Sequence, residues 1–451
     1  MMHRPAASGQ GRTRRACLRL RRTAVGRFHA VRLQRVRRLA ETQLTFLLLR
    51  PLRQLPFALL WAGLATAATG DQLFAVVLSW VAVGLFGTAA GYLAALQAAA
   101  TLITALLAGR WADRVEPRRL MIAADLARAV FLLVVVAVWL GRGSPAAWTL
   151  IVCVLVLAAG QALFRPALQA TVPVLAGDAS MLPAANALLD TTERIARLLG
   201  PGLVGMIGGL MPLVHFVTVN VATFVASALA VFSITRLRPA VPVPPVARVG
   251  LLANVLHGFI VVRRHKLLGF MLAVTGMVNG TWYCAYFLGL PLMLGRGGAG
   301  LAAYGTVISC YGATNLLSTL VVGNRGMSPR PARNIFAGNC FGGSGIVLLG
   351  LAGLLAPPGW LLAALVGAAA LGAIGGPLQD ITVATLRQTA LPRHDLPAAV
   401  RAFMVMNNGG ALLALLAAPR VFDSIGVAPA VMLCGGITLC VGATGWWRFA
   451  R

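Results

Sequence analysis

Charged side chains are scarce in this sequence, and acidic ones are scarcer still. Only 11% of its 451 residues are charged, with 11 acidic residues against 39 basic ones, whereas soluble globular chains carry about 25% charged residues. A soluble protein of this length could not cover its surface with so few charges. Because hydrophobic residues make up 59% of the chain, we expect the excess apolar surface to face lipid. The composition therefore predicts a polytopic membrane protein.

Motifs for catalysis, metal binding and nucleotide binding are missing as well. The sequence contains no His-Glu-x-x-His, no Gly-x-Ser-x-Gly and no phosphate-binding loop, and its seven cysteines form no Cys-x-x-Cys pair. We therefore expect no catalytic residue, no metal site and no cofactor, and we predict that the protein is not an enzyme. Without a nucleotide site, any transport would draw on an ion gradient.

Fourteen of the 39 basic residues lie in residues 1–53, beside a single acid, Glu41. No short apolar core with a cleavage site follows them, so we expect an uncleaved, disordered cytosolic tail held near anionic lipid headgroups. Nucleic-acid binding is disfavoured because aromatic residues do not alternate with the arginines. The basic excess therefore predicts membrane lipid, and not RNA or DNA, as the partner.

Apolar runs long enough to cross about 30 Å of hydrocarbon follow one another from residue 56 onward. They show no period-two alternation, which leaves helices as the spanning element. The sequence therefore predicts an all-α membrane protein with twelve transmembrane helices. We place them near residues 57–83, 90–108, 120–140, 148–165, 186–210, 214–235, 267–294, 301–323, 334–356, 359–382, 399–419 and 427–447.

Basic residues between the runs predict the orientation. Loops after even-numbered runs hold sixteen of them, whereas loops after odd-numbered runs hold only Arg142, Arg296 and Arg420. Positive loops stay in the cytosol, so we expect both termini to be cytosolic. The longest connection, residues 236–266, divides the chain into six-helix halves at 54–235 and 267–451. Gln-x-x-x-Pro followed by Leu-Pro-Ala-Ala occurs in both halves, which is typical of the internal repeats of secondary transporters.

The connection after the second run, residues 109–119, combines a glycine, an acid and several arginines. An acid there can bond a neighbouring helix N-terminus in one conformation and release it in another; the alternative is a positive loop whose acid only offsets charge. The spacing resembles the cytosolic signature of the major facilitator superfamily, Gly-x-x-x-Asp-Arg followed by basic residues, with Glu116 and Pro117 as departures. That resemblance implies a conformational latch formed by Gly109, Asp113, Arg114, Arg118 and Arg119.

Other segments resemble the enterobactin-exporter and macrolide-efflux branch of this superfamily. They are Gly70-Asp71, Phe164-Arg-Pro-Ala, Ala185-Asn-Ala-Leu, Leu252-Ala-Asn-Val-Leu-His-Gly and Arg263-Arg-His-Lys. The fifth run also resembles the antiporter signature of the superfamily, which accompanies exporters, at Gly200, Pro201, Gly202 and Gly205. Ordinary packing of small residues is the alternative for this run.

Asp71 lies about fifteen residues into the first run, roughly 21 Å from its cytosolic edge, which is too deep for the side chain to reach water along the helix. An acid at mid-helix costs roughly 2.5–3.5 kcal/mol on insertion scales, and a carboxyl group in an apolar site can exchange protons near neutrality. We therefore take Asp71 as the candidate for binding the coupling proton or a cationic substrate. The alternative is a helix-capping or packing acid that is hydrogen-bonded to the eleventh run.

Further ionisable residues lie inside the predicted spans. Asp125 and Arg128 are three apart on one helical face, which favours a structural ion pair. Glu193, Arg194, Arg197 and Asp380 are candidates for contacts that break when the halves move.

The seventh run offers polar and aromatic residues that either line a cavity for flat amphipathic ligands or form an interfacial aromatic belt. They are Asn279, Trp282, Tyr283 and Tyr286.

Together these features predict a major facilitator fold in a bacterial inner membrane. We expect a monomeric exporter of amphipathic small molecules, such as a drug, macrolide or siderophore, in exchange for protons. The alternatives are an importer or facilitator on the same fold, and a transport-inactive membrane receptor or scaffold.

Overall fold

The computed structural model describes residues 50–112, 115–176, 181–237, 251–296, 300–324, 328–392 and 395–450. Every regular element in these ranges is helical, which agrees with the predicted all-α class. The helices are α2 (Leu55–Phe86), α3 (Ala90–Ala112), α4 (Pro117–Arg142), α5 (Ala147–Ala176), α6 (Leu182–Ile207), α7 (Leu213–Leu237), α8 (Leu251–Arg264), α9 (Lys266–Tyr283), α10 (Leu290–Arg296), α11 (Leu301–Asn324), α12 (Pro331–Leu355), α13 (Pro358–Ala373), α14 (Gly375–Ala390), α15 (Leu396–Ile425) and α16 (Val427–Phe449).

Proline residues begin some of these helices, and glycine residues end others. Pro117 and Pro331 occupy the first turns of α4 and α12, where the missing N–H would have no intrahelical partner in any case. Gly143, with φ of 74°, ends α4, and Gly426, with φ of 87°, separates α15 from α16. Because glycine adopts positive φ without a steric penalty, the chain can reverse direction there within a few residues.

Ten helical stretches of the described chain are long and apolar enough to cross a membrane. One of them, Leu55–Thr104, contains both α2 and most of α3, and another, Gly359–Ala390, contains α14 and most of α13. Helix α6 is not among the ten, and it carries four charged residues, Asp190, Glu193, Arg194 and Arg197. The chain therefore has the features of a multi-pass membrane protein. Helix α6 is long enough to span a membrane but carries several charged residues.

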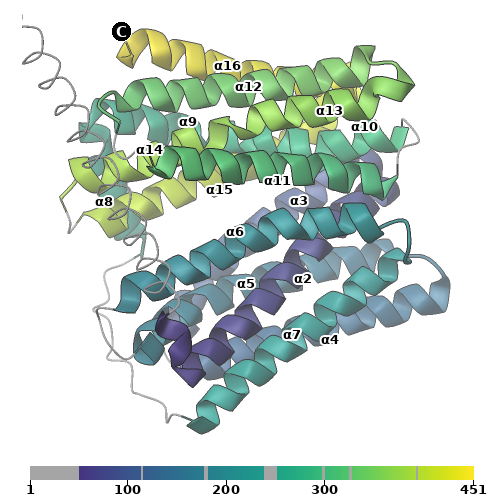
Figure 1. The fold of residues 1–451 in the computed structure, drawn as a ribbon, viewed down its shortest axis with the longest axis vertical. Coiled ribbons are helices and arrows are strands. Elements are labelled where there is room, and N and C mark those ends of the chain that lie inside the picture. The colour runs from purple at the N-terminus through teal and green to yellow at the C-terminus, as the bar shows by residue number, and fades with distance from the viewer. Residues whose placement is uncertain are drawn as a thin grey trace, which may run out of the picture.

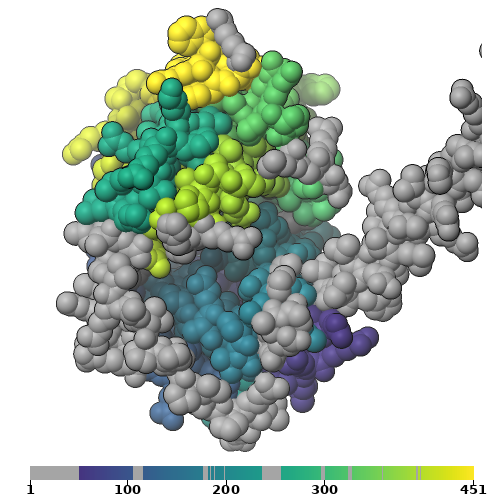
Figure 2. All heavy atoms as spheres, turned by 90° about the vertical axis from the view of Figure 1, so that its left-hand side faces the viewer, coloured from purple at the N-terminus to yellow at the C-terminus, as the bar shows by residue number. Residues whose placement is uncertain are grey.

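The helices lie in two groups, α2–α7 and α8–α16, which occupy the lower and upper parts of Figure 1. At the left of that view, where α8 lies, the two groups diverge, and toward the right they converge. We call these the linker end and the turn end. Figure 2 looks at the linker end and shows the α2–α7 group below the other group.

Buried hydrophobic residues follow the same division. At the linker end each group has a core of its own, represented by Phe57 and Leu188 in the first group and by Leu268 and Phe336 in the second. The largest core contains residues of both groups, including Phe74, Val81, Tyr304 and Phe422. The two groups therefore share apolar packing toward the turn end and are packed separately toward the linker end.

Three kinds of contact join the groups at the turn end. The Thr88 hydroxyl donates a hydrogen bond of 2.7 Å to Asp423 Oδ1. The rings of Trp80 and Tyr304 stack with centroids 6.2 Å apart. A Cβ atom at Gly91 would lie 3.0 Å from Pro419, which shows how closely α3 approaches α15.

Helix boundaries differ from the sequence prediction by up to eleven residues. Helix α5 continues eleven residues past the predicted end at 165 and reaches Ala176, and Arg165 within it is paired with Glu193. Residues 251–264, predicted only as part of a linker, form α8. His265, in an extended conformation, separates α8 from α9, and its Nδ1 accepts a hydrogen bond from the Leu268 N–H.

Candidate functional site

Asp71 lies midway along α2, where α2 and α7 pack closely. A Cβ atom at Gly70 would lie 2.7 Å from Asn220 Oδ1, so only glycine permits this approach. Asn220 is fully buried, and its Oδ1 accepts a hydrogen bond of 3.1 Å from the Thr223 hydroxyl. The Asn220 side chain also interacts with the Asp71 carboxyl group. The backbone next to Asp71 is thus held against a buried polar segment of α7.

A cavity of about 60 Å³ opens beside Asp71 between α2, α4, α5 and α6. This volume suffices for a few water molecules, each of which needs about 10–15 Å³ of such space. None of its described lining residues comes from α15. The polar lining residues are Asp71, Arg128, Gln161, Arg165, Thr192 and Glu193.

Among the charged residues that line the cavity, Arg128 is the most deeply buried. It is 3% exposed and forms an ion pair with Asp125, which is 0% exposed. Its Nη1 donates to Gln161 Oε1 at 3.1 Å and its Nε donates to the Ala124 carbonyl at 3.3 Å. A buried arginine needs such a set of acceptors, because an uncompensated charge in a low-dielectric site is strongly unfavourable.

The apolar surroundings of Arg128 are equally specific. Its guanidinium lies 4.3 Å from the Phe224 ring centroid and 5.2 Å from that of Phe164, within the range of cation–π attraction. A Cβ atom at Gly160 would lie 2.7 Å from Arg128 Cδ, so the absence of a side chain on α5 makes room for the arginine. Arg128 therefore connects α4, α5 and α7 behind the cavity.

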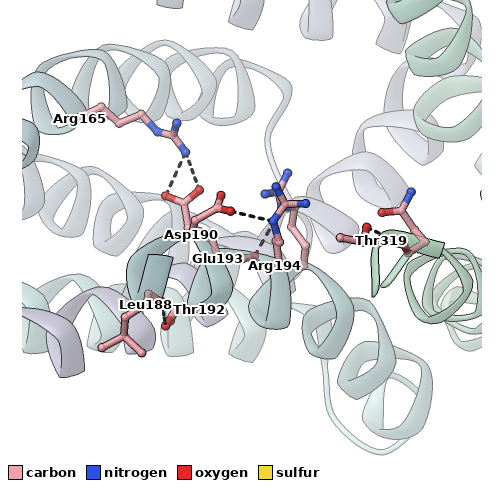
Figure 3. Close-up of polar contacts among 9 residues, drawn as sticks. Arg165, Leu188, Asp190, Thr192, Glu193, Arg194 and Thr319 are labelled. Carbon is pink, nitrogen blue, oxygen red and sulfur yellow. Dashed lines mark hydrogen bonds and ion pairs between the residues drawn. The ribbon is translucent and has the colours of Figure 1, made fainter. Parts of the chain in front are cut away.

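The charged half of α6 forms two further ion pairs, drawn in Figure 3. Arg165 Nη2 on α5 lies 2.8 Å from Glu193 Oε2, and Arg194 Nε lies 2.9 Å from Asp190 Oδ2 one turn away. The side of α6 that bears Arg194 faces the segment of α11 that carries Thr319. Arg197 Nε donates to the backbone carbonyl of Glu193 at 3.4 Å.

The small residues in the second half of α6 sit between two neighbours. Gly200 packs against Gln72 of α2. A Cβ atom at Gly305 of α11 would lie 2.6 Å from the Gly205 nitrogen and 2.9 Å from the Pro201 carbonyl, and one at Gly202 would lie 3.4 Å from Ser309 Oγ. This segment is thus the place where α6 of the first group contacts α11 of the second.

Aromatic rings gather in the second group at the junction of α9, a π-helical turn (Cys284–Gly289) and α11. Trp282 Nε1 donates to the Tyr311 hydroxyl at 2.9 Å, and the rings of Tyr286 and Tyr311 have centroids 4.8 Å apart. Tyr283 packs edge-on against Trp282. Tyr286 is only 1% exposed. It packs against the rings of Trp282 and Tyr311.

The remaining predicted residues are spread over the structure. Asn279 Nδ2 donates to the Asn407 carbonyl of α15 at 3.5 Å, and Asp380 is exposed on α14. Of the proposed latch, Gly109 lies in α3, Arg118 is buried, and Arg119 Nε lies 3.1 Å from Glu116 Oε2. Asp113 and Arg114 lie outside the described residues.

Sequence reasoning missed several partners of these residues. Gln161 and Arg165 lie four residues apart in an apolar run, so they share one face of α5, and this spacing was a usable signal. Asn220 and Asp190 carried no comparable signal, because their roles depend on which helices become neighbours.

Comparisons with known proteins agree with this architecture. The family model described as the Major Facilitator Superfamily matches residues 60–345, and no curated relative matches the sequence. Among solved structures, a bacterial homologue of the iron transporter ferroportin in an inward-facing state is similar at 13% identity, with 86% of this chain and 98% of that chain covered and a TM-score of 0.67.

Two other solved transporters are similar to the same degree. The nucleoside transporter NupG shares 12% identity over 88% of this chain and 99% of its own, with a TM-score of 0.67. A POT family transporter in complex with 5-aminolevulinic acid shares 13% identity over 89% and 96%, with a TM-score of 0.65. At these identities the likeness concerns the fold. Together with the family match over more than half of its length, it shows that the chain belongs to the major facilitator superfamily.

Proposed function

We propose that the chain is a proton-coupled secondary transporter with twelve membrane spans in two halves. Counting α2 and α3 separately adds one span to the ten apolar stretches, and α6 adds the twelfth. The halves would comprise residues 54–235 and 267–451, joined by the linker 236–266 and preceded by a cytosolic tail, residues 1–53. The distribution of basic residues favours cytosolic termini. In this proposal the protein lies in a bacterial inner membrane and works as a monomer.

The observation that carries the proposed coupling is the position of Asp71. Asp71 borders a small, mostly apolar cavity at mid-helix, which is also lined by Arg128, an arginine that is already paired with Asp125. An acid inside a membrane protein is costly and usually functional. In the proposed cycle Asp71 binds a proton in one conformation and releases it in the other, which links the proton gradient to the movement of the halves.

Export of an amphipathic small molecule is the direction and substrate class that we favour. The small residues of α6 resemble the antiporter signature, and several segments resemble the enterobactin-exporter and macrolide-efflux branch. Trp282, Tyr283 and Tyr311 offer ring surface for a flat apolar ligand. Gly109, Asp113, Arg114, Arg118 and Arg119 remain the proposed latch at the cytosolic side.

The test measures accumulation of ethidium and a macrolide in a pump-deficient bacterium that expresses the chain, with and without a protonophore. We expect expression to lower accumulation, and both the protonophore and Asp71→Asn to restore it. Glu41→Gln, which neutralises the single acid of the tail, is the matched control and should behave like the parent chain.

Two results would favour the alternatives. Uptake that exceeds the background, with no protection from toxins, would indicate an importer or facilitator. No flux of any tested compound in a well-expressed protein, unchanged by Asp71→Asn, would favour a transport-inactive receptor or scaffold.

A further inference from the structure

Helix α8 is docked rigidly on the second group by one of its faces. Val261 and Val262 are buried in the linker-end core of that group, and Gly258 meets the backbone of Ala398 so closely that no Cβ atom would fit. His257 Nε2 lies 2.8 Å from Asp395 Oδ1, just before α15 begins. The orientation of α8 about its own axis is therefore fixed by contacts within the chain.

These contacts also place α8 relative to the membrane-spanning segments. At its C-terminal end α8 is separated by His265 alone from Lys266, the first residue of the apolar stretch Lys266–Gly295. At Gly258 it touches Ala398, the first residue of the stretch Ala398–Ile425. Residues 258–265 thus run from the end of one span to the end of another, at the level where the hydrocarbon gives way to lipid headgroups.

The opposite face of α8 combines apolar and basic side chains. Leu256 is 54% exposed and Ile260 is 56% exposed, one turn apart, and Arg263 and Arg264 are exposed in the next turn. Lys266 follows directly and is exposed too. The α8 sequence contains no acidic residue. A fixed helix that presents a mixed apolar and basic face at a membrane boundary has the properties of an interfacial helix.

We propose that this exposed face of α8 is a binding surface for anionic phospholipid headgroups. In this arrangement Leu256 and Ile260 insert among the upper parts of the acyl chains, while Arg263, Arg264 and Lys266 contact the phosphates. Charge complementarity commits the surface to anionic lipid, because basic residues next to a span are attracted to the negative surface of the membrane. The inference does not depend on transport, direction or substrate.

The experiment uses the full chain in a cysteine-free background, with an environment-sensitive fluorophore on Ile260→Cys, reconstituted in phosphatidylcholine vesicles with or without phosphatidylglycerol. Lipids with a nitroxide high on the acyl chain and aqueous iodide serve as competing quenchers. Leu229→Cys on the exposed side of α7 is the lipid-facing control, and Ser144→Cys in the exposed α4–α5 turn is the water-facing control.

We expect nitroxide lipid to quench the probe at residue 260, as it does at 229, and phosphatidylglycerol to increase this quenching. Arg263→Gln with Arg264→Gln should remove about half or more of that increase, as should high salt. Arg330→Gln, which removes an exposed charge just before α12, should leave it unchanged.

Three outcomes would overturn the proposal. Iodide quenching equal to that at residue 144 would place the face in water. Protection from both quenchers would mean that protein covers it. Nitroxide quenching that is the same with and without phosphatidylglycerol would leave an apolar contact with lipid but no recognition of anionic headgroups.

Discussion

The two helix groups differ in what they enclose. The first group encloses charge: Asp125 and Arg128 form a buried ion pair, and Asp71 borders a cavity that Arg128 also lines. The second group encloses rings, centred on Trp282 and Tyr311. Under the proposed function, the coupling ion would therefore bind in the first group and the amphipathic ligand would contact the rings of the second.

Helix α6 lies next to the charged residues of the first group and also contacts the second group. Its first half carries the ion pairs next to the cavity, and its second half packs through Gly205 against Gly305 of α11. A change in charge on the first group therefore acts on the same helix that contacts the second. Three substitutions, given in order of decreasing expected effect, test whether the groups differ as described.

The largest effect is expected for Arg128→Met. Removing one member of a buried ion pair leaves the other charge uncompensated, which costs about 3–5 kcal/mol. Thermal unfolding of the purified protein in detergent should show a large loss of stability. The double variant Asp125→Asn with Arg128→Met should regain part of that loss, because the uncompensated charge is gone. A double variant no more stable than Arg128→Met would contradict the explanation by charge.

An intermediate effect is expected for Trp282→Phe in the second group. The change keeps most of the ring packing but removes the indole N–H that donates to the Tyr311 hydroxyl at 2.9 Å. Loss of a partner for a partly buried polar group costs about 1–3 kcal/mol. Thermal unfolding should detect this loss, while Trp360→Phe, at a tryptophan that is largely exposed, should show none. Equal losses of stability at the two positions would mean that the hydrogen bond from Trp282 to Tyr311 does not stabilise the ring cluster.

The smallest effect is expected for Arg165→Gln. Arg165 and Glu193 are both substantially exposed in their pair, so their coupling should be about 0–1 kcal/mol. A double-mutant cycle with Glu193→Gln, read out by thermal unfolding, measures this value. A coupling energy well above that range would mean that water does not screen the Arg165–Glu193 pair. The exposed pair and the buried Asp125–Arg128 pair would then not differ as described.

Local sequence patterns predicted the helical class, the order of the apolar runs and the proximity of Asp125 to Arg128. These depend on run length and on spacing within one helix. The partners of Arg165 and Asn220 could not be predicted, because they depend on the packing of helices that are distant in the sequence. Arg165 also misled the prediction of where α5 ends, since an arginine in an apolar run reads as a loop residue until its acidic partner is known.

The position of the aromatic rings also could not be predicted from the sequence. Sequence alone could not distinguish a cavity lining from an interfacial belt, because both require aromatic residues near a helix end. The π-helical turn at Cys284–Gly289 and the partner Tyr311, which lies on a different helix, were not predictable from spacing, and they determine that Tyr286 is buried.

The docking of α8 has a consequence for the order in which the protein is made. His257 and Asp395 are separated by 138 residues, and at about 5–20 residues per second of synthesis the ribosome needs on the order of ten seconds to cover that distance. During that time the linker helix lacks the surface against which Gly258 packs. Helix α8 reaches its final position only when α15 has been synthesised. Packing of α8 therefore coincides with completion of the second group.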